Sequence, residues 1–436
     1  MTKLHKYFWT VFFLLLLVLV SARASFSREK ESSRSDIIAD QYIVVFKDDV
    51  GDPQAVAEEI EKKHGLAREH VYQKAVKGFS GKISSEKLQR VKDDPRVLFV
   101  SEDRKVSFLV KDGPKEEKVP RQNARKPNPT PTQPPQKIPT GISRIGLNAN
   151  NEGDGIGVAV IDTGIDLSHP DLKDNIVANK TCVIGTSSGN DDNGHGSHVA
   201  GTIAAVNNTI GVLGVAPKAK LFAVKVLNAQ GSGTWSSVIC GVDWVTANAV
   251  SYNIKVANMS LGGGGTSDNN CGNSNSDALH KALCRSRDAG VTYVVAAGNS
   301  GANASNSVPA AYDDAVITVS ALADSDGQPG GTGSATSYGA DDTFATFSNY
   351  GSVVDLGGPG VSIYSTYKNK GYATLSGTSM SSPHVAGSAA LYLKTNPSAS
   401  WTSVRDGLKA AGEPLGSGHT DPSGLHPEPV VKASGL

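Results

Sequence analysis

The chain lacks a surplus of charge, because its 42 Lys and Arg residues are matched by 42 Asp and Glu residues. Domains that bind nucleic acids usually carry a strongly basic surface, so this balance argues against a nucleic-acid partner. Beyond the N-terminus the chain also lacks an apolar run near the roughly 20 residues that a membrane-spanning helix needs. Its 39% hydrophobic content over 436 residues still suits a protein of at least two domains with a sizeable core.

The N-terminus carries the one marked apolar run. Lys3 and Lys6 precede an apolar stretch from residue 7 to 20, and Ala22-Arg23-Ala24 follows it. A basic start, a short apolar stretch and an A-x-A ending are typical of a secretory signal peptide. A membrane anchor is the alternative, but residues 11–20 are too few to span a bilayer. We predict a signal peptide over residues 1–24 and a secreted, extracellular protein with no membrane association after its removal.

Cysteine is scarce, with four residues in the chain. In a secreted protein four cysteines favour disulfides. Cys271 lies in a polar insertion and Cys284 on the helix predicted to follow it, so these two are the preferred pair. Cys182 and Cys240 are left either as a second disulfide or as buried thiols.

The stretch 377–387, Gly-Thr-Ser-Met-Ser-Ser-Pro-His-Val-Ala-Gly, predicts a tight turn that enters a helix, with Pro383 in the first helical turn. Ser379 would then lie at a helix N-terminus, where the partial positive charge favours an alkoxide and later an oxyanion. A turn with no chemical role is the alternative. A nucleophilic serine also needs a base and a carboxylate that orients it.

Two upstream segments supply those groups. Residues 158–162 form an apolar, β-branched run that ends in an acid, which places Asp162 at the end of a buried strand. His195 lies between glycines just before an apolar, helix-like segment. Taken singly, Asp162 suits a turn and His195 an exposed loop. Together with Ser379 they predict a catalytic triad. Asn299 follows a further buried-strand pattern, where asparagine is ordinarily a turn former.

The order Asp162, His195, Ser379, in the settings I-D-T-G, H-G-S-H-V-A-G and G-T-S-M-S-S-P-H-V-A-G, resembles the subtilisin family of serine proteases over roughly residues 136–395. Subtilisin is itself the reference case for this order. The resemblance implies a serine endopeptidase that acts through an acyl-enzyme. It also implies that the Asn299 side-chain amide and the Ser379 backbone amide stabilise the oxyanion.

Residues 136–436 are predicted to form the catalytic domain. Strand-like segments alternate with helix-like ones, as in 221–227 before 236–249 and 255–261 before 277–289. This alternation predicts an α/β, doubly wound parallel sheet flanked by helices. The helix after Ser379 carries small residues on all sides, so we expect it to be buried between the layers.

Residues 36–110 show a small α+β pattern. Strands at 42–46, 79–83 and 97–100, helices at 54–64 and 84–92, and a further strand at 69–73 give a ferredoxin-like order. Because this segment precedes the triad, it resembles the inhibitory propeptide of the subtilisin family. That propeptide assists folding and then blocks the cleft. We predict self-cleavage near Leu109, which makes the chain's own propeptide a partner, beside protein or peptide substrates.

Residues 111–135 are predicted to be a linker. Seven prolines between residues 111 and 137 favour an extended, protease-accessible segment. Its length departs from familiar subtilisins, so the position of the mature N-terminus stays open.

Residues 1–137 hold 26 basic and 19 acidic residues, and the remainder of the chain holds 16 basic and 23 acidic residues. Opposite charges would steer the two parts together, with a chance distribution as the alternative.

Residues 231–235 and 260–263 contain glycines and resemble the two strands with which the family pairs substrate. The resemblance also implies that Trp235 borders the S4 subsite and that residues 297–298 form a wall of S1. The alternatives are ordinary turns and a core tryptophan. The expected substrate-binding residues are Gly231, Ser232, Gly233, Trp235, Ser260, Leu261, Gly262, Ala297 and Gly298. Neither Ser300 nor Ser307 is acidic, so we expect broad specificity with an apolar or aromatic P1 residue.

Residues 206–212 resemble the high-affinity calcium loop of subtilisins. Calcium takes six to eight oxygen ligands, and an ordinary polar loop is the alternative. The resemblance implies ligation by carbonyls and side chains of Gln136, Asp171, Val206, Asn208, Ile210 and Val212. A maturation cut in the linker should therefore fall before Gln136.

The sequence disfavours two other classes of function. A catalytically silent scaffold is disfavoured because every catalytic group is present. A lipase-like hydrolase needs a serine within G-x-S-x-G, and residues 377–381 do not match that pattern. We therefore predict a self-processing, secreted serine endopeptidase, expected to be a monomer, whose natural substrate the sequence does not define.

Overall fold

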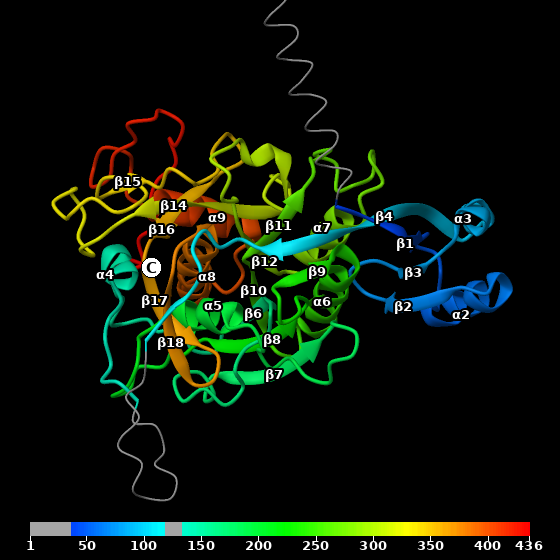
Figure 1. The fold of residues 1–436 in the computed structure, drawn as a ribbon, viewed down its shortest axis with the longest axis horizontal. Helices are drawn as coiled ribbons and strands as arrows, with labels where there is room; N and C mark the ends of the chain where they lie inside the picture. The colour runs from blue at the N-terminus through cyan, green and yellow to red at the C-terminus, as the bar shows by residue number, and fades with distance from the viewer. Residues whose placement is uncertain (1–35, 118–132) are drawn as a thin grey trace, which may run out of the picture.

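The computed structural model describes residues 36–117 and 133–436. The predicted signal peptide and most of the predicted linker lie outside these ranges. A small N-terminal domain lies against one side of a larger body (Figure 1), and a long strand runs from the small domain across the larger one. Within the described ranges, no helix has the length and hydropathy to cross a membrane.

The small domain has the predicted β-α-β-β-α-β order. Its strands pair antiparallel in the order β4-β1-β3-β2, with two helices on one face. The elements are β1 (Ile37–Phe46), α2 (Pro53–His64), β2 (Ala67–Tyr72), β3 (Gly78–Lys82), α3 (Ser85–Lys92) and β4 (Val97–Phe108). β4 extends well past the predicted strand end at Val100, because its second half pairs with β9 (Ser232–Thr234) and β11 (Leu261–Gly264) of the larger domain.

The larger domain is built on a parallel sheet, which confirms the predicted fold class. Its strand order is β15-β14-β12-β10-β6-β8-β7, with β16 beside β14, and β15 alone pairs antiparallel among these strands. The strands are β6 (Gly157–Asp162), β7 (Ile176–Thr181), β8 (Lys220–Lys225), β10 (Ile254–Met259), β12 (Thr292–Ala296), β14 (Val316–Ala323), β15 (Thr343–Phe344) and β16 (Leu356–Pro359). β13 (Ser307–Val308) pairs with β11 at the side of the body.

Helices cover both faces of this sheet. Alternate residues of β6 face opposite ways, as the period of a strand requires: Ala159 and Ile161 join a core with α6 and α7, whereas Val158 and Val160 join one with α5 and α8. The helices are α4 (Thr140–Ile145), α5 (His195–Ala204), α6 (Trp235–Asn248), α7 (Ala278–Asp288), α8 (Thr378–Thr395) and α9 (Trp401–Ala411). Of the 18 residues of α8, 15 are buried, as its small residues predicted.

Pro383 lies inside α8 and not in its first turn, so that prediction was wrong. A proline at this position cannot donate a hydrogen bond to the carbonyl four residues earlier. That carbonyl, Ser379 O, instead accepts a hydrogen bond from Ser260 Oγ at 2.9 Å. A side chain of the neighbouring strand end thus replaces the missing helical bond, so the helix continues through Pro383.

Two disulfides are present. Cys271–Cys284 is the predicted pair, and Cys182–Cys240, which the sequence left open, joins the end of β7 to α6. The segment after Leu109 also has regular structure within the predicted linker: β5 (Lys115–Glu116) pairs antiparallel with β18 (Gly371–Leu375), which in turn pairs with β17 (Ile363–Tyr367).

Candidate active site

Asp162 and His195 meet at the carboxyl end of the parallel sheet, where α/β proteins commonly build their sites. Asp162 is the last residue of β6 and His195 the first of α5. His195 Nδ1 lies 2.7 Å from Asp162 Oδ1, and both side chains are almost fully buried. His195 Nε2 has no hydrogen-bond partner among the described residues, so this nitrogen is available to a reacting group.

Ser379, the second residue of α8, faces the carbonyl group of Leu109. The Ser379 backbone N–H donates to Leu109 O at 3.4 Å, and Leu109 N donates to Ser379 Oγ at 3.1 Å. The Ser379 hydroxyl itself donates to Ser260 O at 3.0 Å. The Leu109–Val110 bond of the chain therefore lies at the serine.

Asn299 lies beside the same carbonyl group. Its Oδ1 accepts from the backbone N–H and the hydroxyl of Thr378, both at 2.9 Å. These bonds fix the orientation of the amide, and its Nδ2 is buried without a partner. A Cβ added at Gly377 would lie 3.1 Å from Asn299 Nδ2 and would also collide with Leu109 O. Gly377 thus leaves the space in which a second donor can approach that oxygen.

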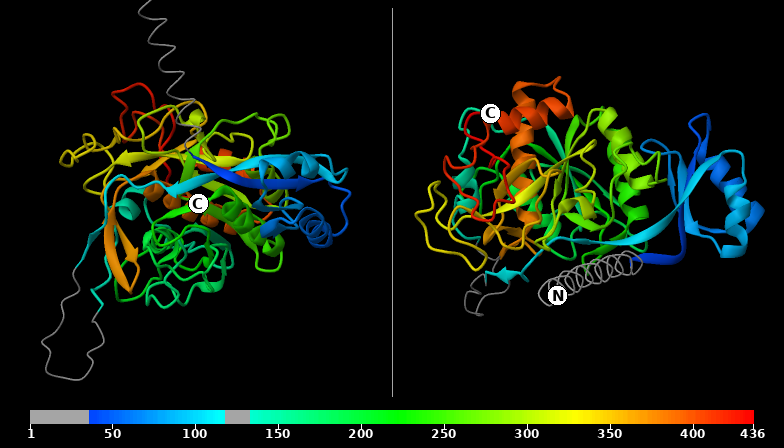
Figure 2. Two further views of the ribbon diagram at one scale, coloured as in Figure 1. Left: turned by 45° about the vertical axis from the view of Figure 1, so that its right-hand side comes forward. Right: turned by 90° about the horizontal axis from the view of Figure 1, so that it is seen from above.

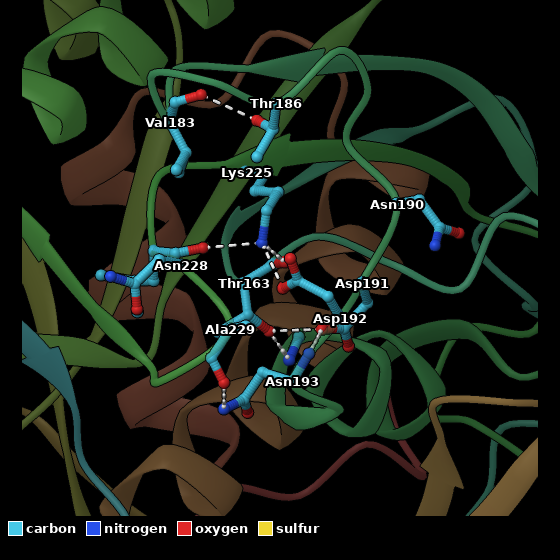
Figure 3. A network of polar contacts seen from close by, with 12 residues as sticks. Thr163, Val183, Thr186, Asn190, Asp191, Asp192, Asn193, Lys225, Asn228 and Ala229 are labelled. Carbon is cyan, nitrogen blue, oxygen red and sulfur yellow. Dashed lines mark hydrogen bonds and ion pairs between the residues drawn. The ribbon is translucent and has the colours of Figure 1, made fainter.

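A polar network holds the strand end and the helix start together (Figure 3). Lys225 is 1% exposed, and its Nζ donates to Thr163 O and Asp192 Oδ1, both at 2.7 Å. The Thr163 hydroxyl donates to Asp191 Oδ1 at 2.9 Å, and Asp191 accepts from the N–H groups of residues 193, 194 and 197. Burial raises the pKa of Asp191, and these hydrogen bonds oppose the rise.

This network was not foreseen from the sequence. Lys225 ends an apolar strand pattern, and a lysine there ordinarily marks an exposed strand end. Its role depends on Asp192 and Thr163, which are distant in sequence and have no spacing rule that links them to Lys225. A single basic residue closing an otherwise apolar run is the only local signal.

The chain before Leu109 lies between the two expected substrate strands. Ser107 pairs with Ser232 on one side and with Gly262 on the other. Phe108 stacks on the His195 ring with 4.7 Å between the ring centroids. A side chain at Gly231 would collide with the Phe108 ring, and one at Gly262 would lie 3.2 Å from Leu109 Cδ1. Both glycines make room for side chains of the bound segment.

The remaining expected subsite residues are Trp235, Ser260, Leu261, Ala297 and Gly298. Trp235 is 5% exposed and shares a core cluster with Val106, three residues before Leu109. Leu261 pairs with Phe108, and Ser260 O accepts from Leu109 N at 3.3 Å. Ala297 and Gly298 follow β12 and lead into Asn299, with the Gly298 N–H donating to Thr378 Oγ1 at 3.1 Å.

The six expected calcium ligands also come together. Asn208 Nδ2 donates to Asp171 Oδ1 at 2.9 Å, and Gln136 Nε2 donates to Val206 O at 2.9 Å and Val212 O at 3.3 Å. Ile210 N donates to Asn208 Oδ1 at 2.7 Å. Asp171 is fully buried, which raises its pKa, and Tyr372, which the sequence did not suggest, donates to its Oδ2 at 3.0 Å.

The small domain docks on α6 through one carboxylate. Asp243 Oδ1 accepts from the backbone N–H groups of Gln73, Lys74 and Ala75 at 3.1, 2.6 and 2.8 Å. Arg285 of the larger domain forms an ion pair with Asp48 of the small one. The acidic groups of this contact thus come from both domains.

Charge steering between the domains, as expected from the sequence, is wrong in its premise. The described N-terminal residues 36–117 hold 15 basic and 17 acidic residues, so the basic surplus lies before residue 36 and between residues 118 and 137. The folded small domain is slightly acidic. Its docking therefore rests on individual hydrogen bonds, the Asp48–Arg285 ion pair and apolar contact.

Comparison with known proteins agrees with this geometry. Residues 153–422 match the subtilase family and residues 41–109 match the peptidase inhibitor I9 family. An alkaline protease of Alkalihalobacillus alcalophilus is 40% identical over 79% of this chain and 77% of that protein, and subtilisin Savinase of Lederbergia lenta is 45% identical over 66% and 97%.

A longer match and a solved structure extend the comparison. Subtilisin amylosacchariticus of Bacillus subtilis subsp. amylosacchariticus is 35% identical over 94% of this chain and 95% of its own. A cold-adapted subtilisin-like serine proteinase of known structure is 35% identical and covers 68% of this chain and 98% of its own, with a TM-score of 0.55. The chain belongs to the subtilase family and is a serine endopeptidase with an inhibitor I9 propeptide domain.

Proposed function

We propose that the chain is a secreted precursor that cleaves its own Leu109–Val110 bond and then hydrolyses extended peptides. The observation that carries this proposal is the position of Leu109, whose carbonyl oxygen accepts from Ser379 N while the preceding residues pair with strands on both sides. Secretion rests on the signal-peptide pattern of residues 1–24.

The reaction follows from the three side chains. Ser379 Oγ attacks the Leu109 carbonyl carbon, and its proton passes to His195 Nε2, the nitrogen left without a partner. Asp162 accepts from His195 Nδ1 and stabilises the imidazolium. The protonated His195 then donates to the departing Val110 nitrogen, which leaves an acyl-enzyme on Ser379. Water, deprotonated by His195, releases the Leu109 carboxylate.

The oxyanion of each tetrahedral intermediate needs two donors. The Ser379 backbone N–H already points at Leu109 O, and the buried, unpartnered Nδ2 of Asn299 supplies the second. The loss of such a side-chain donor in subtilisin lowers kcat by about 10² to 10³. The orientation of Asn299 is set by Thr378, the residue before the nucleophile.

Apolar P1 residues are the proposed preference of the enzyme. In the precursor this position holds Leu109, next to Gly262, and no acidic side chain stands at Ser300 or Ser307 to attract a basic one. Val106 holds the P4 position of this segment and belongs to the same core cluster as Trp235, the residue expected to border S4. The self-cleavage segment therefore carries apolar residues at both P1 and P4.

Replacement of the nucleophile tests the proposal. Ser379→Ala should leave the full precursor uncut when the chain is produced in a host that lacks extracellular proteases. Ser381→Ala is a matched control, because Ser381 is buried in the same helix and its hydroxyl has no hydrogen-bond partner in the described part of the chain. Processed Ser379→Ala protein with an N-terminus at residue 110 would show that another protease makes the cut.

The loop at Asp171 fits calcium. The amide NH2 groups of Gln136 and Asn208 donate to the Val206 carbonyl and the Asp171 carboxylate. A cation bound between these oxygens would take the place of the two donors. Rotation of either amide offers its oxygen to an ion. A bound calcium ion would tie the chain after the linker to the loop at residues 206–212.

Calcium binding is tested by unfolding. At 100-fold over its Kd the ion should stabilise the protein by about 2.7 kcal/mol, and Asp171→Ala should remove most of this gain. Equal melting temperatures in calcium and in excess chelator would exclude the site. Mature enzyme that begins after residue 136 and still gains stability from calcium would exclude Gln136 as a ligand.

A further inference from the structure

A second group of carboxylates lies far from the Asp171 loop, at the carboxyl end of β14. The chain leaves this strand at Ala323 and returns at β15, and the excursion carries Asp324, Asp326 and Asp341. One carboxylate oxygen of each residue lies within 4.8 Å of the other two. Asp324 and Asp341 are buried, with 3% and 5% exposure, whereas Asp326 is exposed.

The group has no ion-pair partner of its own among the described residues, although the charge of Arg144 reaches Asp324. Within residues 36–117 and 133–436, no salt bridge involves any of the three acids. The nearby Arg144 is already engaged by Asp342 and Glu413. Burial of carboxylates that lack a counter-ion is costly, so such groups are usually paired or bind a metal.

Asp324 gives the second, independent observation. Its Oδ2 is buried and has no hydrogen-bond partner among the described residues, while its Oδ1 accepts from Gly327 N at 3.0 Å. A buried acceptor with free lone pairs inside a cluster of acids is the arrangement that a cation would satisfy.

The backbone fixes the other two acids without neutralising them. Asp341 accepts from Ser325 N at 2.8 Å and from Gly333 N at 2.7 Å, and Asp326 accepts from Gln328 N at 2.9 Å. A Cβ at Gly333 would lie 2.8 Å from Asp341 Oδ2. The loop is therefore closed tightly over carboxylates whose mutual repulsion remains.

We propose that Asp324, Asp326 and Asp341 bind a divalent cation, and that the ion is calcium. All three ligands are hard carboxylate oxygens, which favour calcium over zinc or copper. Carboxylates from an irregular loop suit calcium, which takes six to eight oxygen ligands in variable geometry, better than magnesium, which needs a near-ideal octahedron. The ion would join both ends of residues 324–341 at the edge of the parallel sheet.

Metal content tests the site directly. The full chain, carrying Ser379→Ala to prevent self-cleavage, is dialysed against calcium and its bound calcium is measured. Asp324→Asn and Asp326→Asn should each lose one equivalent, or bind it at least tenfold more weakly. Asp406→Asn, an exposed acid on α9, should lose none. Calcium content unchanged in both loop variants would overturn the proposal, and tighter retention of magnesium than of calcium would overturn the choice of ion.

The test is independent of the Asp171 loop. Asp171→Asn should remove the one equivalent of calcium bound at its own loop. Asp171→Asn combined with Asp324→Asn should remove both equivalents of calcium. If the Asp171 loop binds no calcium, Asp324→Asn still lowers the content by one. The two proposals therefore fail separately.

Unfolding separates a metal ligand from a merely structural acid. In chelator, Asp324→Asn should melt at or above the parent temperature, because it removes a repelling charge. In calcium it should melt below the parent, because it has lost the ion. A variant that melts lower under both conditions and retains its calcium would show that Asp324 has a structural role only. Asp326→Asn, at the exposed position, checks the result without any disturbance of the core.

Discussion

In the propeptide domain, the two faces of β1 (Ile37–Phe46) are equally buried but belong to different cores. Along β1, Val44 and Phe46 pack with α2 and α3 in the domain's own small cluster, whereas Ile43 and Val45 join the cluster built on α6 of the catalytic domain. The exposures of Val44 and Val45 are 0% and 1%. One face therefore stays covered after cleavage, and the other is covered only while the two domains are docked.

This difference accounts for two properties expected of the domain. Small domains bury a low fraction of their surface and are marginally stable, so a domain that shares half of its core with the enzyme gains much of its stability on docking. The same docked face covers α6 of the enzyme. Because coupling free energies are reciprocal, docking should stabilise the enzyme as much as it stabilises the propeptide domain. We infer that folding assistance and inhibition arise from the same apolar face, with β4 adding occupation of the cleft.

The largest expected effect comes from a charge placed on one face or the other. Val45→Asp should weaken inhibition by propeptide added to processed enzyme at least 100-fold, because an unpaired buried carboxylate costs several kcal/mol. Val44→Asp should instead unfold the domain itself. Circular dichroism of both isolated domains, in an osmolyte that favours folding, checks the distinction. Equal loss of structure in the two variants would show that the faces are not separate.

Asp243 offers the next largest effect. Asp243→Ala removes the acceptor of three backbone N–H groups of the propeptide domain, and bonds to a charged acceptor are worth about 1.5–3 kcal/mol. We expect inhibition to weaken about 10- to 100-fold with unchanged kcat on a short peptide. Asp243→Glu, which keeps the charge, is the matched variant. A fall in kcat would place the effect in the catalytic domain instead.

The comparison also explains what the sequence could and could not predict. Asp162, His195 and Ser379 each have a local signature, a strand end or a helix start. The structure pairs His195 with Asp162 and places Ser379 at the carbonyl group of Leu109, whose neighbour Phe108 stacks on His195. The two faces of β1 follow from strand periodicity, but nothing local shows that one of them belongs to another domain. Lys225 and Tyr372 act through partners distant in sequence. The prediction for Pro383 was wrong because Ser260 Oγ donates the hydrogen bond that the proline cannot give to Ser379 O. A rule based on helix sequence alone does not include such a distant donor.

Acid should loosen the docked face by a smaller amount. His70, on β2, lies half-buried near Cys182, and burial, aided by the charge of Lys180, lowers its pKa to about 4 in the docked state. A free histidine has a pKa near 6.5. Docking therefore favours the neutral ring, and this stabilisation is complete above about pH 6.5 and is lost as the pH falls toward 4.

Because of His70, the inhibition constant of the propeptide is expected to rise about tenfold when the pH falls from 7.5 to 5.5. Inhibition constants measured at both pH values check it, and His70→Gln should flatten the dependence while other titrating groups remain common to both proteins. A dependence of the same size in His70→Gln would assign it to those other groups.

The smallest expected effect tests a single hydrogen bond on the same face. Tyr72 is fully buried at the end of β2, and its hydroxyl donates to Ser236 O in the first turn of α6 at 3.0 Å. Tyr72→Phe keeps the ring and removes only this donor, so the loss should be about 1 kcal/mol, or roughly fivefold in the inhibition constant. Because Ser236 also donates to Asp103 through its backbone N–H and its hydroxyl, its position should survive the substitution. Combination with Asp243→Ala should then be additive, since the two changes share no partner. A combined effect much larger than the product would show that the face undocks as one unit and not contact by contact.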